Sequence, residues 1–178
     1  ADGAEGVSVR VHPTLLPRTH PLAAVHGAFN AVFVEAENAG ELMFYGQGAG
    51  GTPTASAVMG DVVTVARRLV LGGHMGVEAA SGHVPALPMD KVTTSYSIGL
   101  DVADAPGVLS AVARVFAENG VSIETMRQKS HTDAAGASAE LRFVTHRAPE
   151  AALAATVEAI KGLDVINSVT SVLRVEGV

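Results

Sequence analysis

The chain has 178 residues, of which 48% are hydrophobic and 17% charged, so it can bury a sizeable core and does not belong to the intrinsically disordered class. It contains no cysteine, which excludes disulfide frameworks, thiolate metal sites and cysteine nucleophiles and favours a cytoplasmic location over a secreted one. The net charge of −6, with one basic doublet at Arg67-Arg68, predicts no nucleic-acid partner, and the lack of any run of about 18 apolar residues predicts no membrane partner.

The first elements predicted along the chain are strands. Apolar residues alternate over residues 7–12, which predicts a strand, and a proline-containing connection follows over residues 14–28. Two β-rich runs, 30–37 and 41–45, are joined by Asn38-Ala39-Gly40. Because Asn and Gly tolerate the positive φ of a tight turn, the two runs predict a hairpin.

A glycine segment and a helix come next. Four of residues 46–51 are glycine, and Thr52 and Pro53 follow, which suit the N-cap and the first position of a helix. Gly60 within this helix predicts close packing against another element. The apolar residues recur at steps of three and four and predict one apolar face made of Ala55, Val58, Val62, Val65 and Leu69.

A linker is predicted over residues 72–93. This stretch is rich in glycine and proline, which interrupt both the helical and the strand period. The chain is therefore expected to contain one domain, or part of one, at residues 1–71 and a second domain at residues 94–178.

The second domain has the pattern of a small complete fold. Alternation over residues 96–102 predicts a strand, and Asp104-Ala105-Pro106-Gly107 predicts a turn. Asn119-Gly120 then predicts the left-handed end of a helix. The apolar face expected for that helix consists of Val108, Leu109, Val112, Val115 and Phe116.

The remaining predicted elements are strands at 121–129 and 137–145 around a polar loop at 131–136, a helix from Pro149 to Gly162 and a last strand at 165–175. The order β-α-β-β-α-β is that of the ferredoxin-like fold, in which two helices cover one face of a four-stranded antiparallel sheet. Ser97 and Gly99 give the other face little bulk, so a partner subunit is expected to cover it.

The glycine segment has two interpretations. Glycines before a capped helix let the backbone approach a ligand and aim free N–H groups at a phosphate or carboxylate. Alternatively, the segment is only a turn that begins a helix. No metal site is predicted, because the seven histidines form no i, i+4 pair on a predicted helix, and general acid–base residues are not recognisable.

The turn from Asp104 to Leu109 also has two interpretations. A carboxylate beside the free amides of a helix N-terminus can hold both the ammonium and the carboxylate of an amino acid. In the alternative, Asp104 caps the helix and Gly107 only suits the turn. The residue pattern alone leaves the two interpretations open.

The second half resembles the ACT domain, a regulatory module that usually binds an amino acid at a domain interface. The resemblance rests on Asp104-Ala-Pro-Gly107-Val-Leu109 and on Phe116-Ala-Glu-Asn-Gly120-Val-Ser-Ile123, and it extends over about residues 94–178. It implies an amino-acid effector, with L-threonine the first candidate, and a homo-oligomer, most simply a dimer through ACT. The implied effector-binding residues are Asp104, Gly107, Val108 and Leu109, with Asn119, Ser122 and Ile123 supplied by a partner chain.

The first half resembles the end of the catalytic region of homoserine dehydrogenase. The matching strings are Pro21-Leu-Ala-Ala-Val-His-Gly-Ala-Phe-Asn-Ala-Val32 and Phe44-Tyr-Gly-Gln-Gly-Ala-Gly-Gly-Thr-Pro-Thr-Ala-Ser-Ala-Val-Met-Gly-Asp61. The resemblance implies that Gly48, Ala49 and Gly50 lie on the NAD(P) side of the active-site cleft. The family's dinucleotide-binding fingerprint, catalytic lysine and acidic substrate ligands are not in this sequence.

The implied fold class is therefore the tail of an α/β catalytic domain followed by a ferredoxin-like ACT domain. The chain is expected to be a C-terminal fragment of an NAD(P)-dependent oxidoreductase that interconverts L-homoserine and L-aspartate 4-semialdehyde. By itself it is expected to hold no catalytic residue, to bind no cofactor and to be inactive. The alternatives are a stand-alone amino-acid sensor and an ACT module that only dimerises.

Overall fold

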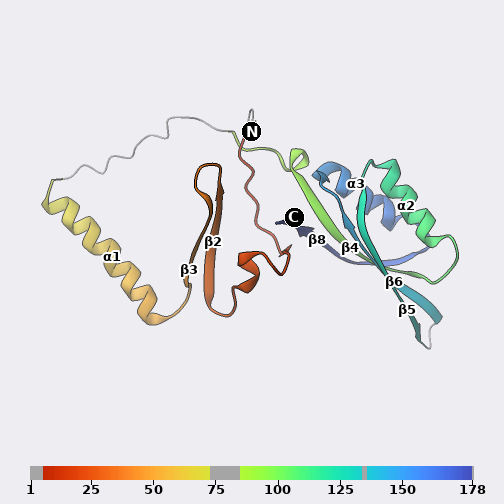
Figure 1. The fold of residues 1–178 in the computed structure, drawn as a ribbon, viewed down its shortest axis with the longest axis horizontal. Helices are drawn as coiled ribbons and strands as arrows, with labels where there is room; N and C mark the ends of the chain where they lie inside the picture. Colours follow the sequence, from red (N-terminus) through yellow and green to blue (C-terminus); the bar gives the residue numbers. More distant parts are fainter. Residues whose placement is uncertain (1–5, 73–84, 134–135, 178) are drawn as a thin grey trace. The chain divides into compact units, whose positions relative to one another are not determined.

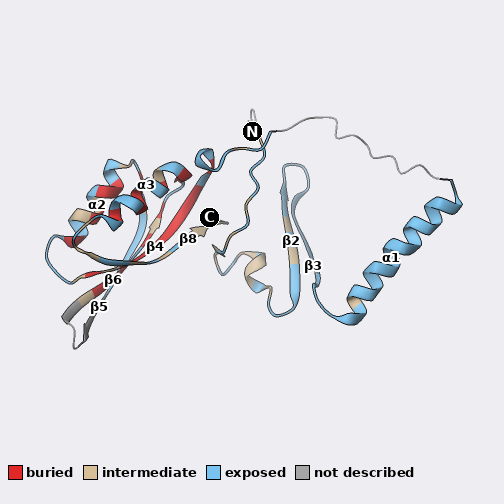
Figure 2. Ribbon diagram, turned by 180° about the vertical axis from the view of Figure 1, so that it is seen from behind, coloured by how far each residue is buried: buried red, intermediate tan, exposed pale blue. Residues whose placement is uncertain are grey.

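The computed structural model describes residues 6–72, 85–133 and 136–177. The chain divides into two compact units, one made of residues 1–16 and 84–178 and the other of residues 17–83. The first unit has a buried interior, whereas none of the described residues of the second unit is buried (Figure 2).

The first unit is a sheet covered on one face by two helices (Figure 1). The order β8-β4-β6-β5 is antiparallel throughout, so the predicted β-α-β-β-α-β arrangement is confirmed. The structure adds β1, which lies parallel to the end of β8, and β7, which pairs with the beginning of β4. The elements are β1 (Thr14–Leu15), the 3-10 helix η2 (Met89–Lys91), β4 (Thr93–Ala103), α2 (Val108–Glu118), β5 (Ile123–Asp133), β6 (Gly136–Thr145), β7 (Ala148–Pro149), α3 (Glu150–Lys161) and β8 (Ile166–Val175).

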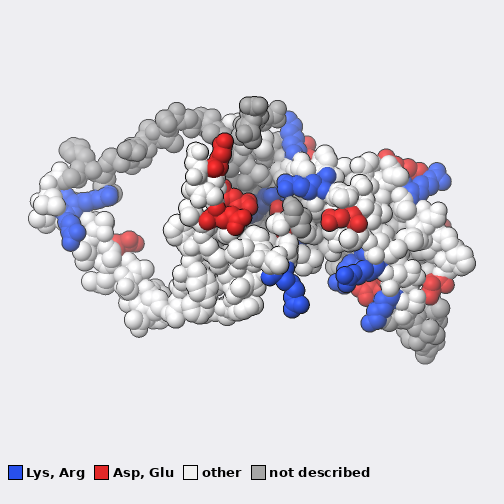
Figure 3. Space-filling model, in the orientation of Figure 1, with Lys and Arg blue, Asp and Glu red and all other residues white. Residues whose placement is uncertain are grey.

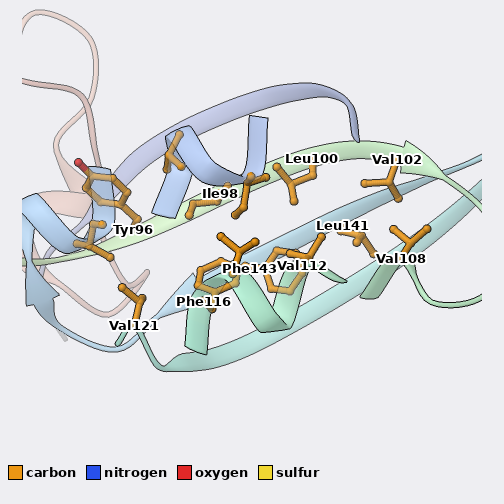
Figure 4. Packing of buried hydrophobic residues seen from close by; sticks show 14 of the residues in the cluster. Tyr96, Ile98, Leu100, Val102, Val108, Val112, Phe116, Val121, Leu141 and Phe143 are labelled. Atoms are coloured by element: carbon orange, nitrogen blue, oxygen red, sulfur yellow. The ribbon is translucent and has the colours of Figure 1, made fainter. Parts of the chain in front are cut away.

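The core lies between the sheet and the two helices (Figure 4). Because successive strand residues point to opposite faces, alternate residues of β4 meet the helices. The rings of Phe116 and Phe143 lie 5.3 Å apart at the centre of this core. Leu109, expected on the buried face of α2, is 40% exposed because it lies at the edge of that face. The most deeply buried large apolar side chains are Ile98, Leu100, Val102, Val112, Phe116, Leu141, Phe143, Leu153 and Ile160.

The predicted end of α2 is confirmed. Gly120 has φ of 67°, and its N–H donates to the carbonyl of Ala117 at 3.1 Å. The N–H of Val121 donates to the carbonyl of Phe116 at 2.9 Å. These two bonds form a Schellman motif, which satisfies carbonyls that the last helical turn leaves unpaired.

The opposite face of the sheet is polar along much of β5 and β6, whereas Ser97 of β4, in register with Val144 and Leu173, is buried. Across β5 and β6, Arg127 is in register with Arg142 and Lys129 with Glu140. A side chain at Gly99 on β4 has no room, because its Cβ would lie 2.6 Å from the hydroxyl oxygen of Ser171. Since a polar face of an antiparallel sheet can contact water, the fold itself does not require a covering subunit there. That subunit stays a prediction.

A buried polar cluster ties α3 to β4 and β8. The Tyr96 hydroxyl donates to Glu150 at 2.6 Å, and the guanidinium of Arg174 donates to both oxygens of the same carboxylate. Burial acts to raise the pKa of Glu150, but the hydrogen bonds from Arg174 and Tyr96 outweigh it and hold this pKa below its ordinary value. Burial and the nearby carboxylate raise the pKa of Tyr96 to about 12.

Two predictions about strand limits in this unit are wrong. The strand expected at residues 7–12 does not form; Val7 makes an isolated bridge with Ala86, and the chain joins the sheet only at β1. Alternation marks residues that can form a strand, but a strand also needs a hydrogen-bonding partner. The loop expected at 131–136 is shorter, because pairing of β5 with β6 continues to Asp133 and Gly136.

The second unit consists of a hairpin and a long helix. The predicted hairpin is confirmed, with Gly40 at φ 68° after the turn. Both of its faces are apolar: Phe29, Phe33, Met43 and Tyr45 alternate with Val32, Val34, Leu42 and Phe44. The elements are the 3-10 helix η1 (Pro21–Ala24), β2 (Phe29–Ala36), β3 (Gly40–Gln47) and α1 (Gly51–Val70).

The predicted N-cap of α1 is wrong. The helix begins before Thr52, its N-cap is Gly50 at φ 132°, and no side chain caps it. The apolar face is present but unburied, since Val58, Val62 and Leu69 are all exposed. No atom lies within 4 Å of a Cβ built at Gly60, so the close packing expected there does not occur within the described residues.

Glu150→Gln should destabilise the first unit by about 2 kcal/mol, because it removes the buried carboxylate that accepts hydrogen bonds from the half-buried Arg174 guanidinium and from Tyr96. Since the folded-state pKa of Glu150 is lowered, its contribution is present above the ordinary value of 4.5 and is lost as the pH falls through the folded-state pKa. Urea denaturation of the two chains at pH 7 and at pH 3.5 measures this difference.

Glu118→Gln is the matched control, because Glu118 forms an exposed pair with Arg114 and its loss should cost less than about 0.5 kcal/mol. Equal denaturation midpoints for wild type and Glu150→Gln at pH 7 would contradict the role given to the buried cluster.

Candidate functional site

A small pocket lies where β4 ends and α2 begins. Four predicted effector-binding residues, Asp104, Gly107, Val108 and Leu109, meet there. Strands β5 and β6 close the pocket with Gln128 and Leu141. The full lining is Val102, Ala103, Asp104, Ala105, Gly107, Val108, Leu109, Gln128 and Leu141.

The backbone of this turn leaves hydrogen-bond donors free. Gly107 is the N-cap of α2 in the left-handed conformation, with φ of 92°, and no side chain caps the helix. The alternative role of Asp104 as a cap is therefore wrong. The first intrahelical bond is donated by Ala111 to the carbonyl of Gly107 at 3.0 Å, and within the described residues the amides of Leu109 and Ser110 have no partner. These amides carry the positive end of the helix dipole.

The pocket combines two kinds of polar group with apolar walls. Within the described residues the Asp104 carboxylate makes no hydrogen bond or ion pair, and Asp104 lines the same pocket as the first residues of α2. A carboxylate accepts from an ammonium group, and amides donate to a carboxylate, so the arrangement suits an α-amino acid. Val102 and Leu141 supply the apolar wall.

Gln128 is a pocket residue that the sequence analysis did not identify. It lies on β5 opposite Leu141 of β6, and this register brings it beside the turn. Its carboxamide both donates and accepts hydrogen bonds, so it can read a polar ligand side chain. No sequence signal marks it, because its position depends on the pairing of two strands.

The other predicted effector residues lie at the opposite end of α2. The side-chain Nδ2 of Asn119 donates to the carbonyl of Val115 at 2.9 Å, and the backbone N–H of His146 donates to the carbonyl of Ser122 at 2.9 Å. Ile123 is paired with Thr145 and packs against the core. Within one chain the structure does not bring them to the Asp104 turn, so their contribution from a partner chain stays a prediction.

The glycine turn joins β3 to α1. The N–H of Gly48 donates to the carbonyl of Ala28 at 2.9 Å, and Ala49 and Gly50 lead into the helix. The N–H of Thr54 donates to the carbonyl of Gly50 at 3.1 Å, and the preceding helix amides have no partner among the described residues. Gly48 also ends a shallow groove along the hairpin, lined by Asn30, Ala31, Val32, Phe44, Tyr45, Gly46, Gln47 and Gly48.

Other kinds of site find no support in the described part of the chain. No group of three His, Asp or Glu side chains there is arranged to hold a metal ion. No described helix is long and apolar enough to cross a membrane. In the view of Figure 3, Lys and Arg side chains are spread over several elements and alternate with Asp and Glu. The hydroxyl of Thr64 donates to the carbonyl of Gly60 within α1, at 2.8 Å.

Comparison with known proteins assigns each half of the sequence to a family. Residues 2–63 match the family described as homoserine dehydrogenase, and residues 96–165 match the ACT domain. The homoserine dehydrogenase of Mycobacterium tuberculosis is 54% identical over 178 residues, which are 99% of this chain and 40% of that protein. That of Corynebacterium glutamicum is 49% identical over 175 residues, covering 98% of this chain and 38% of that protein.

A solved homoserine dehydrogenase from Thiobacillus denitrificans has a similar structure. The TM-score is 0.85 at 34% sequence identity, and the match covers 98% of this chain and 40% of that one. The chain thus spans about two-fifths of the length of the relatives that it matches.

Proposed function

This chain belongs to the homoserine dehydrogenase family and carries an ACT domain, and from this premise we propose that it is the carboxy-terminal part of an amino-acid-regulated oxidoreductase. The reaction is the NAD(P)-dependent interconversion of L-homoserine and L-aspartate 4-semialdehyde in the cytoplasm. The proposed boundaries are residues 1–71 for the tail of the catalytic domain, 72–93 for the linker and 94–178 for the regulatory domain, although residues 1–16 group with the regulatory unit through the pairing of β1 with β8.

The observation that carries this proposal is the unburied second unit. A hairpin with two apolar faces is typical of a sheet that is covered on both sides. The exposed apolar face of α1 likewise needs a surface to pack against. A stand-alone amino-acid sensor has no use for such a unit, so the observation favours a catalytic tail that packs into a larger body.

The glycine turn suits the cofactor side of the cleft. It combines glycines with helix amides that have no partner among the described residues, so the backbone at Gly48, Ala49 and Gly50 can approach a polar ligand closely. A bound nicotinamide supplies the hydride transfer. The role of these three residues is to bind this cofactor and to orient it. No residue of this chain is assigned to catalysis, and the chain alone is proposed to be inactive.

L-Threonine is the proposed effector in the pocket at the Asp104 turn. Asp104 accepts from its ammonium group, and the free amides of α2 donate to its carboxylate. The carboxamide of Gln128, which lines the same pocket, is proposed to pair with the hydroxyl of the ligand. A pocket that hydrogen-bonds this hydroxyl discriminates against apolar amino acids, because an apolar ligand would leave the hydrogen-bonding group of the pocket unpaired.

The outer edge of β5 is the proposed dimer contact. β5 is the last strand of the sheet, so alternate residues along its eleven positions present backbone N–H and C=O groups outward, whereas the end of β8 is covered by β1. Leu109 and Met126, which are 40% and 37% exposed, add apolar surface beside that edge. Gln128 is the middle residue of β5, so antiparallel pairing of two β5 strands about it would bring the two Gln128 residues together and the partner's Ser122 and Ile123 toward the Asp133 end.

A chimera tests the catalytic proposal. The matching segment of the Mycobacterium tuberculosis homoserine dehydrogenase, 54% identical, is replaced by this chain. The chimera should oxidise L-homoserine with NAD or NADP at an ordinary turnover of about 1–1,000 per second, and the isolated chain should not. A chimera that melts cooperatively but does not turn over, or turnover by the isolated chain, would contradict the proposal.

Threonine binding is measured by thermal unfolding of the chain. At about 100 times the dissociation constant, L-threonine should stabilise the native state by about 2.7 kcal/mol and raise Tm by about 5–10 °C. Asp104→Ala should lose most of this shift, whereas Asp101→Ala, on the open face of β4 just before the turn, should keep it. If no small amino acid moves the Tm of the wild type, the ACT domain serves only in dimerisation.

Sedimentation velocity tests the dimer contact. The chain at tens of micromolar should sediment as a dimer, and Met126→Asp should weaken the dimer at least about tenfold, because it buries a charge at the β5 edge. Met89→Asp is the control, since Met89 is 40% exposed but lies on η2. A monomeric wild type, or equal effects of the two substitutions, would exclude this edge as the contact.

A further inference from the structure

Asn30 of β2 packs directly against the glycine turn. A Cβ built at Gly48 would lie 1.9 Å from Nδ2 of Asn30, 2.4 Å from its Cγ and 2.8 Å from its Oδ1. All three atoms of the carboxamide end therefore occupy the place that a side chain at position 48 would take. This contact explains why residue 48 is glycine, although its φ requires none.

The Asn30 carboxamide is otherwise unused. Asn30 is exposed, and within the described residues its side-chain carboxamide makes no hydrogen bond. Asparagine is disfavoured in strands, and β2 is otherwise mostly apolar on both faces. Asn30 also lies opposite Gly46, so the residue across the hairpin has no side chain that could cover it.

The groove beside the turn ends at this amide. Asn30 and Gly48 line the same groove, together with Gly46 and Gln47. A carboxamide offers two N–H donors and a carbonyl acceptor in one plane. Held against a glycine, it is presented in a narrow range of orientations, which lowers the entropy lost when it binds a ligand.

We propose that Asn30 is a cofactor-binding residue, with its carboxamide held in position by contact with Gly48 and directed to a polar group of the nicotinamide cofactor. The inference rests on the proposed function, because it takes the glycine turn as the cofactor side of the cleft. It adds a side chain to a turn that otherwise offers only backbone groups. Asn30 and Gly48 then act as a pair, since any side chain at position 48 must displace the carboxamide.

A double-mutant cycle in the chimera tests the pair. The dissociation constant of NADH or NADPH is measured by fluorescence titration, which does not depend on turnover. Asn30→Ala removes the carboxamide, and Gly48→Ala displaces it, so each should weaken cofactor binding about tenfold. The affinity of the double variant for the cofactor should also be about tenfold lower than that of the wild type, rather than about a hundredfold lower, because both changes remove the same contact.

Asn38→Ala is the matched control, since Asn38 lies in the turn at the other end of the hairpin and its loss should change cofactor binding less than about twofold. The KM for L-homoserine should stay within about twofold in all variants, and thermal unfolding should show that each is folded. A merely structural role of Asn30 would lower Tm and affect both substrates alike.

The outcomes separate the two levels of proposal. A wild-type chimera that binds no cofactor would contradict the proposed function itself. A wild-type chimera that binds cofactor, with unchanged binding in Asn30→Ala or with additive losses in the double variant, would overturn only the assignment of Asn30.

Discussion

The first unit depends on the pairing of β4 with strands on both sides. β4 is hydrogen-bonded to β6 and to β8, so its register determines which side chains meet the helices. A shift of one residue would turn Ile98 and Leu100 to the open face and bring Ser97 and Gly99 into the core. Gly99 reinforces this register, because the hydroxyls beside it leave no room for a side chain. The positions of the helices and strands that follow β4 in the chain therefore depend on this strand.

The pocket is a consequence of where β4 ends. The strand stops at Ala103, and Gly107 in the left-handed conformation begins α2 without a side-chain cap. Within the described part of the chain the first amides of the helix and the Asp104 carboxylate have no partner and line one pocket, to which β5 and β6 add a carboxamide and an apolar wall. The pocket and the core share residues: Val102, Val108 and Leu141 belong to the buried cluster under the helices and also line the pocket, whereas Asp104 and Gln128 add polar groups at its exposed side.

The second unit is stabilised in a different way from the first. Its hairpin and helix are regular, with a complete antiparallel register from Phe29 to Ala36, yet no described residue in it is buried. Local hydrogen bonds define these elements, but apolar burial within the unit does not hold them together. Such surfaces are consistent with relatives more than twice as long as this chain, in which further polypeptide is available to cover them.

The sequence by itself determined the elements whose periodicity and caps are local. The alternation of β4, the apolar face of α2, the Gly120 cap and the hairpin turn at Gly40 each depend on neighbouring residues, so they were predictable, as was half of the pocket, from Asp104 to Leu109. Only the tertiary structure decided the rest, because it depends on which strands pair. Residues 7–12 alternate yet find no partner along their length, Gln128 reaches the pocket through its register with Leu141, and Asn119, Ser122 and Ile123 lie a helix length away from it. The contact of Asn30 with Gly48 likewise forms only when β2 and β3 pair, since eighteen positions along the chain separate two residues that the folded hairpin brings together.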